Sequence, residues 1–101
     1  MKQPTTYMMA NCYDGVLYIG VTSNITERVW QHKQGAIRGF TKRYHVHRLV
    51  YYEFHPTMHD AIQREKYLKH QRRTYKINLI ASENPQWYDL YPSLIGTDTT
   101  D

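Results

Sequence analysis

Two ionisable side chains, Arg28 and His32, lie in a segment whose apolar residues follow helical spacing. Ile25, Val29 and Ala36 mark one face of this segment, and Arg28 and His32 occupy positions i+3 and i+7 from Ile25. One helical turn separates the two side chains by about 6 Å along the axis, so both can contact one ligand. The alternative is that both lie at the edge of the stripe and extend into solvent.

A carboxylate completes the apolar face of a second helical segment. This face is formed by Met58, Ala61, Ile62 and Leu68. Glu65 occupies the remaining inward position, at i+4 from the alanine and i+3 from the isoleucine. An unpaired inward carboxylate is costly, so we expect Glu65 to be paired, protonated or bound to a metal ion. The alternative to a metal is a salt bridge to a nearby cation: Arg64, Lys69 or Arg28.

The first element that must position such residues is a β-hairpin. Residues 7–12 and 16–22 are short, apolar and rich in strand-forming residues, and Asp14-Gly15 between them is a turn signal. Tyr18 lies in the second of these runs, just before Gly20. Taken alone, Tyr18 is most simply an ordinary strand aromatic.

The helix that carries Arg28 and His32 has recognisable ends. Asn24 is a suitable N-cap, Glu27 is its capping-box partner three residues later, and Gly35 is a suitable C-terminal stop. These signals predict a helix over about 25–34. A basic loop over about 36–47 then leads to a third strand, residues 48–54, rich in β-branched and aromatic residues.

The helix that carries Glu65 begins after Thr57, its predicted N-cap, and runs to about residue 71. A further helix is predicted near 74–82 and is ended by Asn84-Pro85. The order β-β-α-β-α-α predicts an α+β fold in which helices flank a three-stranded, mainly antiparallel sheet. We expect one domain over residues 1–91, with an irregular aromatic segment at 86–91, and a disordered tail over 92–101.

Length and composition restrict the class of protein. A chain of 101 residues supports one core, and its single cysteine forms no internal disulfide. No secretion signal precedes the first polar residues, and no apolar run approaches the roughly 20 residues that span a bilayer. We therefore expect a soluble, cytoplasmic protein with no membrane partner.

Charge is concentrated in the middle of the chain. Residues 28–76 hold twelve of the thirteen Lys and Arg residues and three acidic residues, which gives a net charge of +9. Tyrosines are interleaved with these cations, a pattern that suits binding to a polyanion. Composition alone leaves a solvated basic surface equally consistent.

The residues above, taken together, resemble the GIY-YIG endonuclease family. The resemblance rests on Tyr7, the run Leu17-Tyr18-Ile19-Gly20-Val21-Thr22, Arg28, His32, and Glu65 within Arg64-Glu65-Lys66. It is strengthened by three further segments: Gly39-Phe40-Thr41-Lys42, Arg48-Leu49-Val50-Tyr51-Tyr52-Glu53 and Asn84-Pro85-Gln86-Trp87. It covers roughly residues 5–91 and is greatest to small stand-alone bacterial members, which are similar to the GIY-YIG domain of the excision-repair nuclease.

The resemblance implies a three-stranded antiparallel sheet, one divalent ion, Mg²⁺ or Mn²⁺, and hydrolysis of phosphodiesters in DNA. Tyr7 and Tyr18 match the family's two motif tyrosines, Arg28 its catalytic arginine, and His32 the histidine one turn later. The metal-binding glutamate is Glu65, and a C-terminal asparagine that helps to hold the site is matched by Asn84. The first motif, Thr5-Thr6-Tyr7, lacks the family's glycine and isoleucine.

These residue types suit phosphodiester hydrolysis. Arg28 offers a permanently charged fork of N–H donors to a phosphate, and an ion held by Glu65 can act as a Lewis acid. Ionising a tyrosine at pH 7 costs about 4 kcal/mol unless neighbours lower its pKa. We therefore expect Tyr7 or Tyr18 to take the proton from water, with His32 accepting from the phenol; which tyrosine is the base stays open.

Basic residues outside the site are expected to contact flanking phosphates, foremost Arg38, Lys42, Arg43, Arg48, Lys69 and Arg72. The chain has no room for a separate sequence-reading domain, so a repair-related or structure-selective DNA endonuclease is the leading hypothesis. The alternative is a non-catalytic nucleic-acid-binding module with the same fold. RNA as substrate and an additional protein partner that directs the enzyme both stay open.

Overall fold

The computed structural model describes residues 2–37 and 39–96. The chain forms three strands and five helices in these ranges: β1 (Thr5–Ala10), β2 (Leu17–Thr22), α1 (Ile25–Lys33), α2 (Phe40–Arg43), β3 (Arg48–Phe54), α3 (Met58–Lys69), α4 (Arg73–Glu83) and α5 (Tyr91–Ile95). No helix in these ranges has the length and apolar character needed to cross a bilayer.

The sheet has the strand order β2-β1-β3, and both strand pairs are antiparallel. Every residue of the central strand, β1, is buried. Tyr7 in this strand has Gly20 of β2 as its neighbour on one side and Tyr52 of β3 on the other. The predicted α+β fold with a three-stranded antiparallel sheet is therefore confirmed.

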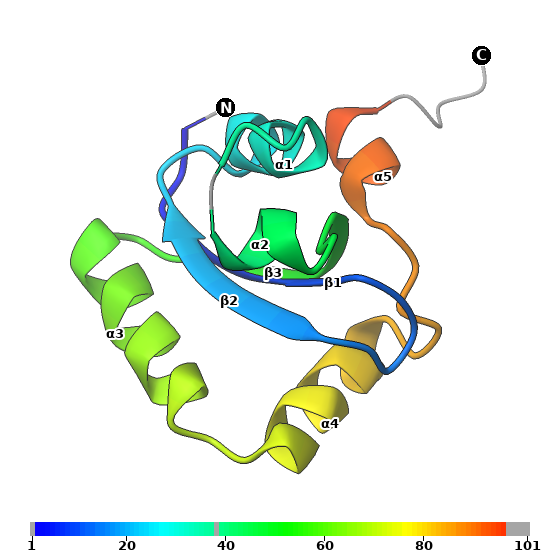
Figure 1. Ribbon diagram of the computed structural model, residues 1–101. Coiled ribbons are helices and arrows are strands. Elements are labelled where there is room, and N and C mark those ends of the chain that lie inside the picture. Colours follow the sequence, from blue (N-terminus) through cyan, green and yellow to red (C-terminus); the bar gives the residue numbers. More distant parts are fainter. Residues whose placement is uncertain (1, 38, 97–101) are drawn as a thin grey trace.

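Helices cover both faces of the sheet, and Figure 1 shows α1 and α5 on one side and α3 and α4 on the other. Alternate residues of β1 point to opposite faces. Met8 thus joins a core cluster with Leu68 of α3 and Ile80 of α4. Tyr7 joins a second cluster, which includes Ile25 and Val29 of α1. Tyr7 therefore points towards the helix that carries Arg28 and His32.

The two predicted N-caps are present. The Asn24 side chain accepts a hydrogen bond from the backbone N–H of Glu27 at 3.2 Å, and α1 begins at the next residue after Asn24. Thr57 does the same for the N–H of Asp60 at 3.1 Å at the start of α3. Such caps satisfy backbone donors that a helix leaves unpaired, so they fix where each helix begins.

Two short helices differ from the sequence-based expectations. α2 is a single turn within the loop predicted at 36–47, and its residue Thr41 is buried. α5 includes residues 92–95, which were predicted as part of a disordered tail. This prediction was wrong because Leu94, with Tyr91, packs against the core cluster that contains Tyr7. Residues 97–101, the rest of the predicted tail, lie outside the described residues.

Candidate active site

Two tyrosines lie over the same glycine. Tyr7 is the cross-strand neighbour of Gly20, and Tyr18 precedes Gly20 by two residues and so lies on the same face of the sheet. A Cβ atom at Gly20 would lie 2.6 Å from the Tyr7 hydroxyl oxygen and 2.9 Å from Cε2 of Tyr18. Only glycine therefore lets both rings cross β2 here, with their centroids 6.2 Å apart.

His32 joins this pair from α1. Its Nε2 atom lies 2.9 Å from the Tyr7 hydroxyl oxygen, and its Nδ1 atom lies 3.0 Å from Oγ1 of Thr41. The ring is 5% exposed. Burial first, and then the positive charge of Arg28, lower the pKa of His32 to about 4. At neutral pH His32 is therefore uncharged, with one nitrogen that donates and one that accepts.

The two tyrosines differ in their access to solvent. Tyr7 is 1% exposed, and burial raises the pKa of its hydroxyl well above the usual value, with the neighbouring Tyr18 as the second cause. Tyr7 therefore keeps its proton at neutral pH. Tyr18 is half-buried and borders a hollow of about 280 Å³, so it is the phenol that faces the solvent side of the site.

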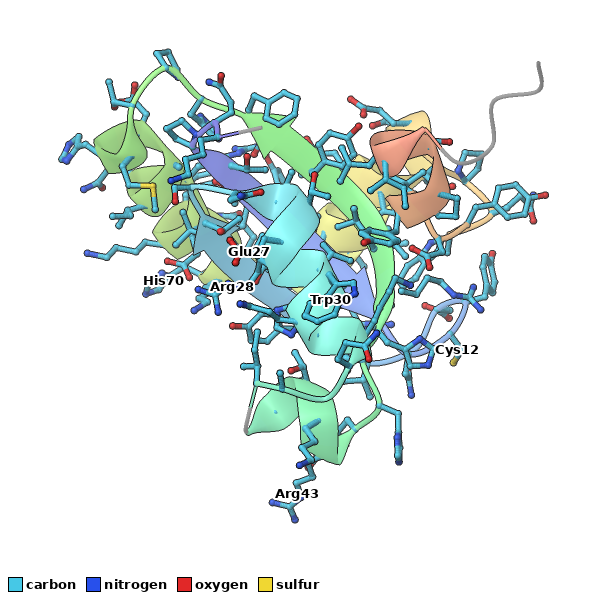
Figure 2. All side chains as sticks on the ribbon, turned by 90° about the horizontal axis from the view of Figure 1, so that it is seen from above. Cys12, Glu27, Arg28, Trp30, Arg43 and His70 are labelled. Carbon is cyan, nitrogen blue, oxygen red and sulfur yellow. The ribbon has the colours of Figure 1, made fainter. Side chains whose placement is uncertain are left out.

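Arg28 supplies a positive charge that acts on the two buried groups, the Tyr7 hydroxyl and the His32 imidazole. It lies one helical turn before His32, and Figure 2 shows it on the side of α1 that faces β2 and α3. Its charge acts to lower the pKa of Tyr7, against the effect of burial, and contributes to the lowered pKa of His32. A guanidinium stays protonated in proteins, so this charge is permanent.

Glu65 lies on α3, and its charge acts on the Tyr7 hydroxyl. Its side chain is 17% exposed, and its Oε2 atom lies 3.1 Å from Nζ of Lys69, which is one of the three predicted salt-bridge partners. The negative charge of Glu65 also acts to raise the pKa of Tyr7. Four predicted residues thus act on the Tyr7 phenol: His32 by a hydrogen bond, Tyr18 by a ring contact, and Arg28 and Glu65 through their charges.

The donor set fits a strongly hydrated ion rather than one that needs a full protein cage. Within residues 2–37 and 39–96 there is no cluster of three or more His, Cys, Asp and Glu able to hold a metal. Mg²⁺ keeps several waters and is bound by one or two carboxylates together with substrate phosphates. Glu65 meets that requirement, because its present partner, Lys69, is half exposed and can swing into solvent.

Asn84 has a different place in the structure. Its Nδ2 atom donates to the carbonyl oxygens of Val50, at 3.1 Å, and Tyr88, at 2.9 Å, and its Oδ1 atom accepts from the N–H of Tyr88. These backbone partners belong to β3 and to the turn after α4. Asn84 therefore fastens α4 to the sheet and makes none of its hydrogen bonds with the residues around Tyr7; its match to the family asparagine stays a prediction.

The predicted nucleic-acid contacts divide into two groups. Arg48 donates to the carbonyl oxygen of Trp87 at 3.0 Å and so links β3 to the segment before α5. The residues with exposed side chains, available to a polyanion, are Lys42, Arg43, Lys69 and Arg72. Arg38 lies outside the described residues. Binding of nucleic acid by any of them stays a prediction.

Thr41 is a residue of the site that the sequence did not single out. Thr41 is buried on α2, and its hydroxyl is hydrogen-bonded to Nδ1 of His32. The imidazole is thus hydrogen-bonded through one nitrogen to Thr41 and through the other to Tyr7. The only signal in the sequence was its place within Gly39-Phe40-Thr41-Lys42, the segment similar to the family. A one-turn helix has too few residues to show periodicity, so its buried face was not predictable.

The protein is therefore a small α+β domain with a phenol pair and a permanent cation on one face of its sheet. Residues 3–78 match the model of the GIY-YIG catalytic domain, and the chain belongs to this family. The nuclease character implied by the resemblance is thereby confirmed at the level of the superfamily.

The relatives that this chain matches include small bacterial proteins. A UPF0213 protein of Clostridium perfringens is 36% identical over 73 residues, which cover 72% of this chain and 78% of that protein. A UPF0213 protein of Limosilactobacillus reuteri is 39% identical over 67 residues, covering 64% and 70%. The solution structure of a UPF0213 protein from Bacillus halodurans is similar, with a TM-score of 0.54, 25% identity and coverage of 96% and 98%.

Replacing Gly20 with alanine should disrupt both the sheet and the site. The added Cβ meets the Tyr7 ring at 2.6 Å, and Tyr7 lies in the fully buried central strand and cannot move aside. We expect Gly20→Ala to lower the free energy of unfolding by about 1–3 kcal/mol, as for other overpacked cores. Urea unfolding followed by circular dichroism measures this, and a wild-type value would contradict the account.

Stability should depend on pH through His32. The unfolded chain binds this proton near pH 6.5 and the folded chain near pH 4, so between these values the unfolded state binds more protons. Stability from this group is thus complete above pH 6.5 and is lost as the pH falls towards 4. The stability advantage of the wild type over His32→Gln should shrink by about 3 kcal/mol from pH 7 to pH 4.

Urea unfolding of both proteins at several pH values measures this difference. The other five histidines are common to both proteins and cancel in the subtraction. A stability difference that stays constant over this pH range would show that the folded protein does not hold His32 uncharged.

Proposed function

We propose that this protein is a metal-dependent endonuclease that hydrolyses phosphodiester bonds in DNA, of a repair-related or structure-selective kind. The observation that carries the proposal is the hydrogen-bonded unit of Tyr7 and His32 with Tyr18 beside it, in the field of Arg28 and Glu65. A module that only binds nucleic acid does not need a buried neutral histidine on a buried phenol, so this unit favours catalysis over the non-catalytic alternative.

Each group has a separate part in this proposal. Arg28 binds the non-bridging oxygens of the scissile phosphate, for which its fork of donors is suited. Tyr18, the solvent-facing phenol, takes the proton from the attacking water while its own hydroxyl proton passes to solvent in the adjoining hollow. Tyr7 and His32 hold Tyr18 in place through the ring contacts at 6.2 and 5.5 Å. The water oxygen bonds to phosphorus, the bond from phosphorus to the leaving oxygen breaks, and the leaving oxygen takes a proton from solvent.

The divalent ion of this proposal, Mg²⁺ or Mn²⁺, would be held by the Glu65 carboxylate. When bound, it supplies Lewis-acid stabilisation of charge on the phosphate and the leaving oxygen. Lys69 would then exchange its partner Glu65 for solvent or for a substrate phosphate. The remaining exposed cations, Lys42, Arg43 and Arg72, contact phosphates on either side of the cleaved bond.

Cleavage should depend on Glu65 and on the shape of the Arg28 side chain. We expect Glu65→Gln to lower the rate on plasmid, nicked and branched DNA by about 100-fold or more, because the site loses its anionic oxygen ligand. Arg28→Lys keeps the charge but loses the paired donors, and should lower the rate by about 10–100-fold. Chelation of divalent ions should abolish the wild-type activity.

Glu83→Gln is the matched control, since Glu83 is an exposed carboxylate at the end of α4, and this variant should cleave as the wild type does. The proposal fails if no metal-dependent product forms on any of these DNA substrates. It also fails if Glu65→Gln and the wild type give equal product.

A further inference from the structure

The buried tyrosine of the site is the first of four aromatic rings that lead to the surface. Tyr18 stacks on Phe40 of α2, with centroids 6.1 Å apart and an angle of 29° between the ring planes. Phe40 also contacts the ring of Tyr44, the residue after α2, with the two ring centroids 4.8 Å apart. Tyr7, at the inner end of this series, is 1% exposed, whereas Phe40 and Tyr44 at its outer end are 43% and 41% exposed.

The outer two rings, Phe40 and Tyr44, are both exposed and lie in contact with each other. Phe40 is 43% exposed, although burying its ring would be favourable. Together with Gly39, Lys42 and Arg43, the two rings line a hollow of about 640 Å³. Within the described residues, the Phe40 and Tyr44 rings thus stay exposed, and Phe40 contacts Tyr18 of the candidate active site.

Among the described residues that line this hollow, the charged ones are all basic. Its lining includes Lys42 and Arg43 and no acidic residue. The Arg43 guanidinium lies 5.5 Å from the centre of the Tyr44 ring, and Figure 2 shows the end of Arg43 extending away from the body of the protein. A ligand for this place combines a flat apolar face with negative charge, and a nucleotide has both.

We propose that Phe40 and Tyr44 form a stacking subsite for an unpaired nucleobase, on the strand whose backbone is cleaved beside Tyr18. The subsite rests on the proposed nuclease function and specifies its substrate. A base inside a duplex has both faces covered by its neighbours, so away from the duplex ends only an unpaired base can stack on these rings. Lys42 and Arg43 then neutralise the phosphates next to that base.

The test measures binding apart from cleavage. Glu65→Gln protein without divalent ions is mixed with a short single-stranded oligonucleotide that carries the fluorescent base 2-aminopurine, and with the same oligonucleotide in a blunt duplex. Binding should change the fluorescence of the single strand through stacking and should favour it over the duplex. Adding Phe40→Leu and Tyr44→Leu to this protein should weaken single-strand binding about fivefold or more per ring.

Two further variants keep the test decisive. Tyr44→Leu alone removes an exposed ring that does not contact Tyr18, so it should leave folding intact and still weaken binding. The control Tyr88→Leu removes a ring that is 68% exposed, after α4, and should bind the single strand as the Glu65→Gln parent does. Thermal unfolding of each variant confirms that the fold is kept.

Unchanged single-strand affinity of the folded Tyr44→Leu protein would overturn the subsite, as would equal affinity for duplex and single strand. Its failure is distinguishable from that of the proposed function. Cleavage by the wild type together with unchanged binding by the leucine variants removes the subsite and leaves the nuclease. Stacking that depends on both rings, with no cleavage by the wild type, removes the nuclease and leaves the subsite.

Discussion

The close approach of two phenol rings above Gly20 is the constraint on which the rest of the site depends. It fixes the register of β1 against β2, because only Gly20 leaves room for the Tyr7 ring next to Tyr18. The hydrogen bond of 2.9 Å from Tyr7 to His32 then sets how α1 lies on the sheet. Arg28, one turn earlier on the same helix, is brought beside the phenols by that placement.

Electrostatics explain why these groups act as a unit rather than as separate titrating residues. Burial keeps Tyr7 protonated and His32 uncharged, so the inner part of the site carries no net charge. The formal charges lie around it, with Arg28 on α1 and Glu65 on α3. A phosphate carries the charge complementary to Arg28, and a hydrated divalent ion carries the charge complementary to Glu65.

Local signals predicted most of the fold, and non-local contacts account for what they missed. Caps such as Asn24 and Thr57 act within three residues, and the apolar stripes identified Arg28, His32 and Glu65 as polar residues on inward faces. The buried role of Thr41 depends on a partner nine residues away, and that of Arg48 on a carbonyl 39 residues away. Such pairings leave no trace in spacing or composition.

The central claim is that Tyr7 and His32 form one functional unit in cleavage, and a double-mutant cycle tests it most directly. Tyr7→Phe keeps the ring over Gly20 and removes only the hydroxyl, and His32→Gln removes its partner. Cleavage rates are compared for the wild type, both single variants and the double variant. The account predicts that the double variant cleaves no more slowly than the slower single variant. Losses that multiply would show that the two residues act independently and would contradict it.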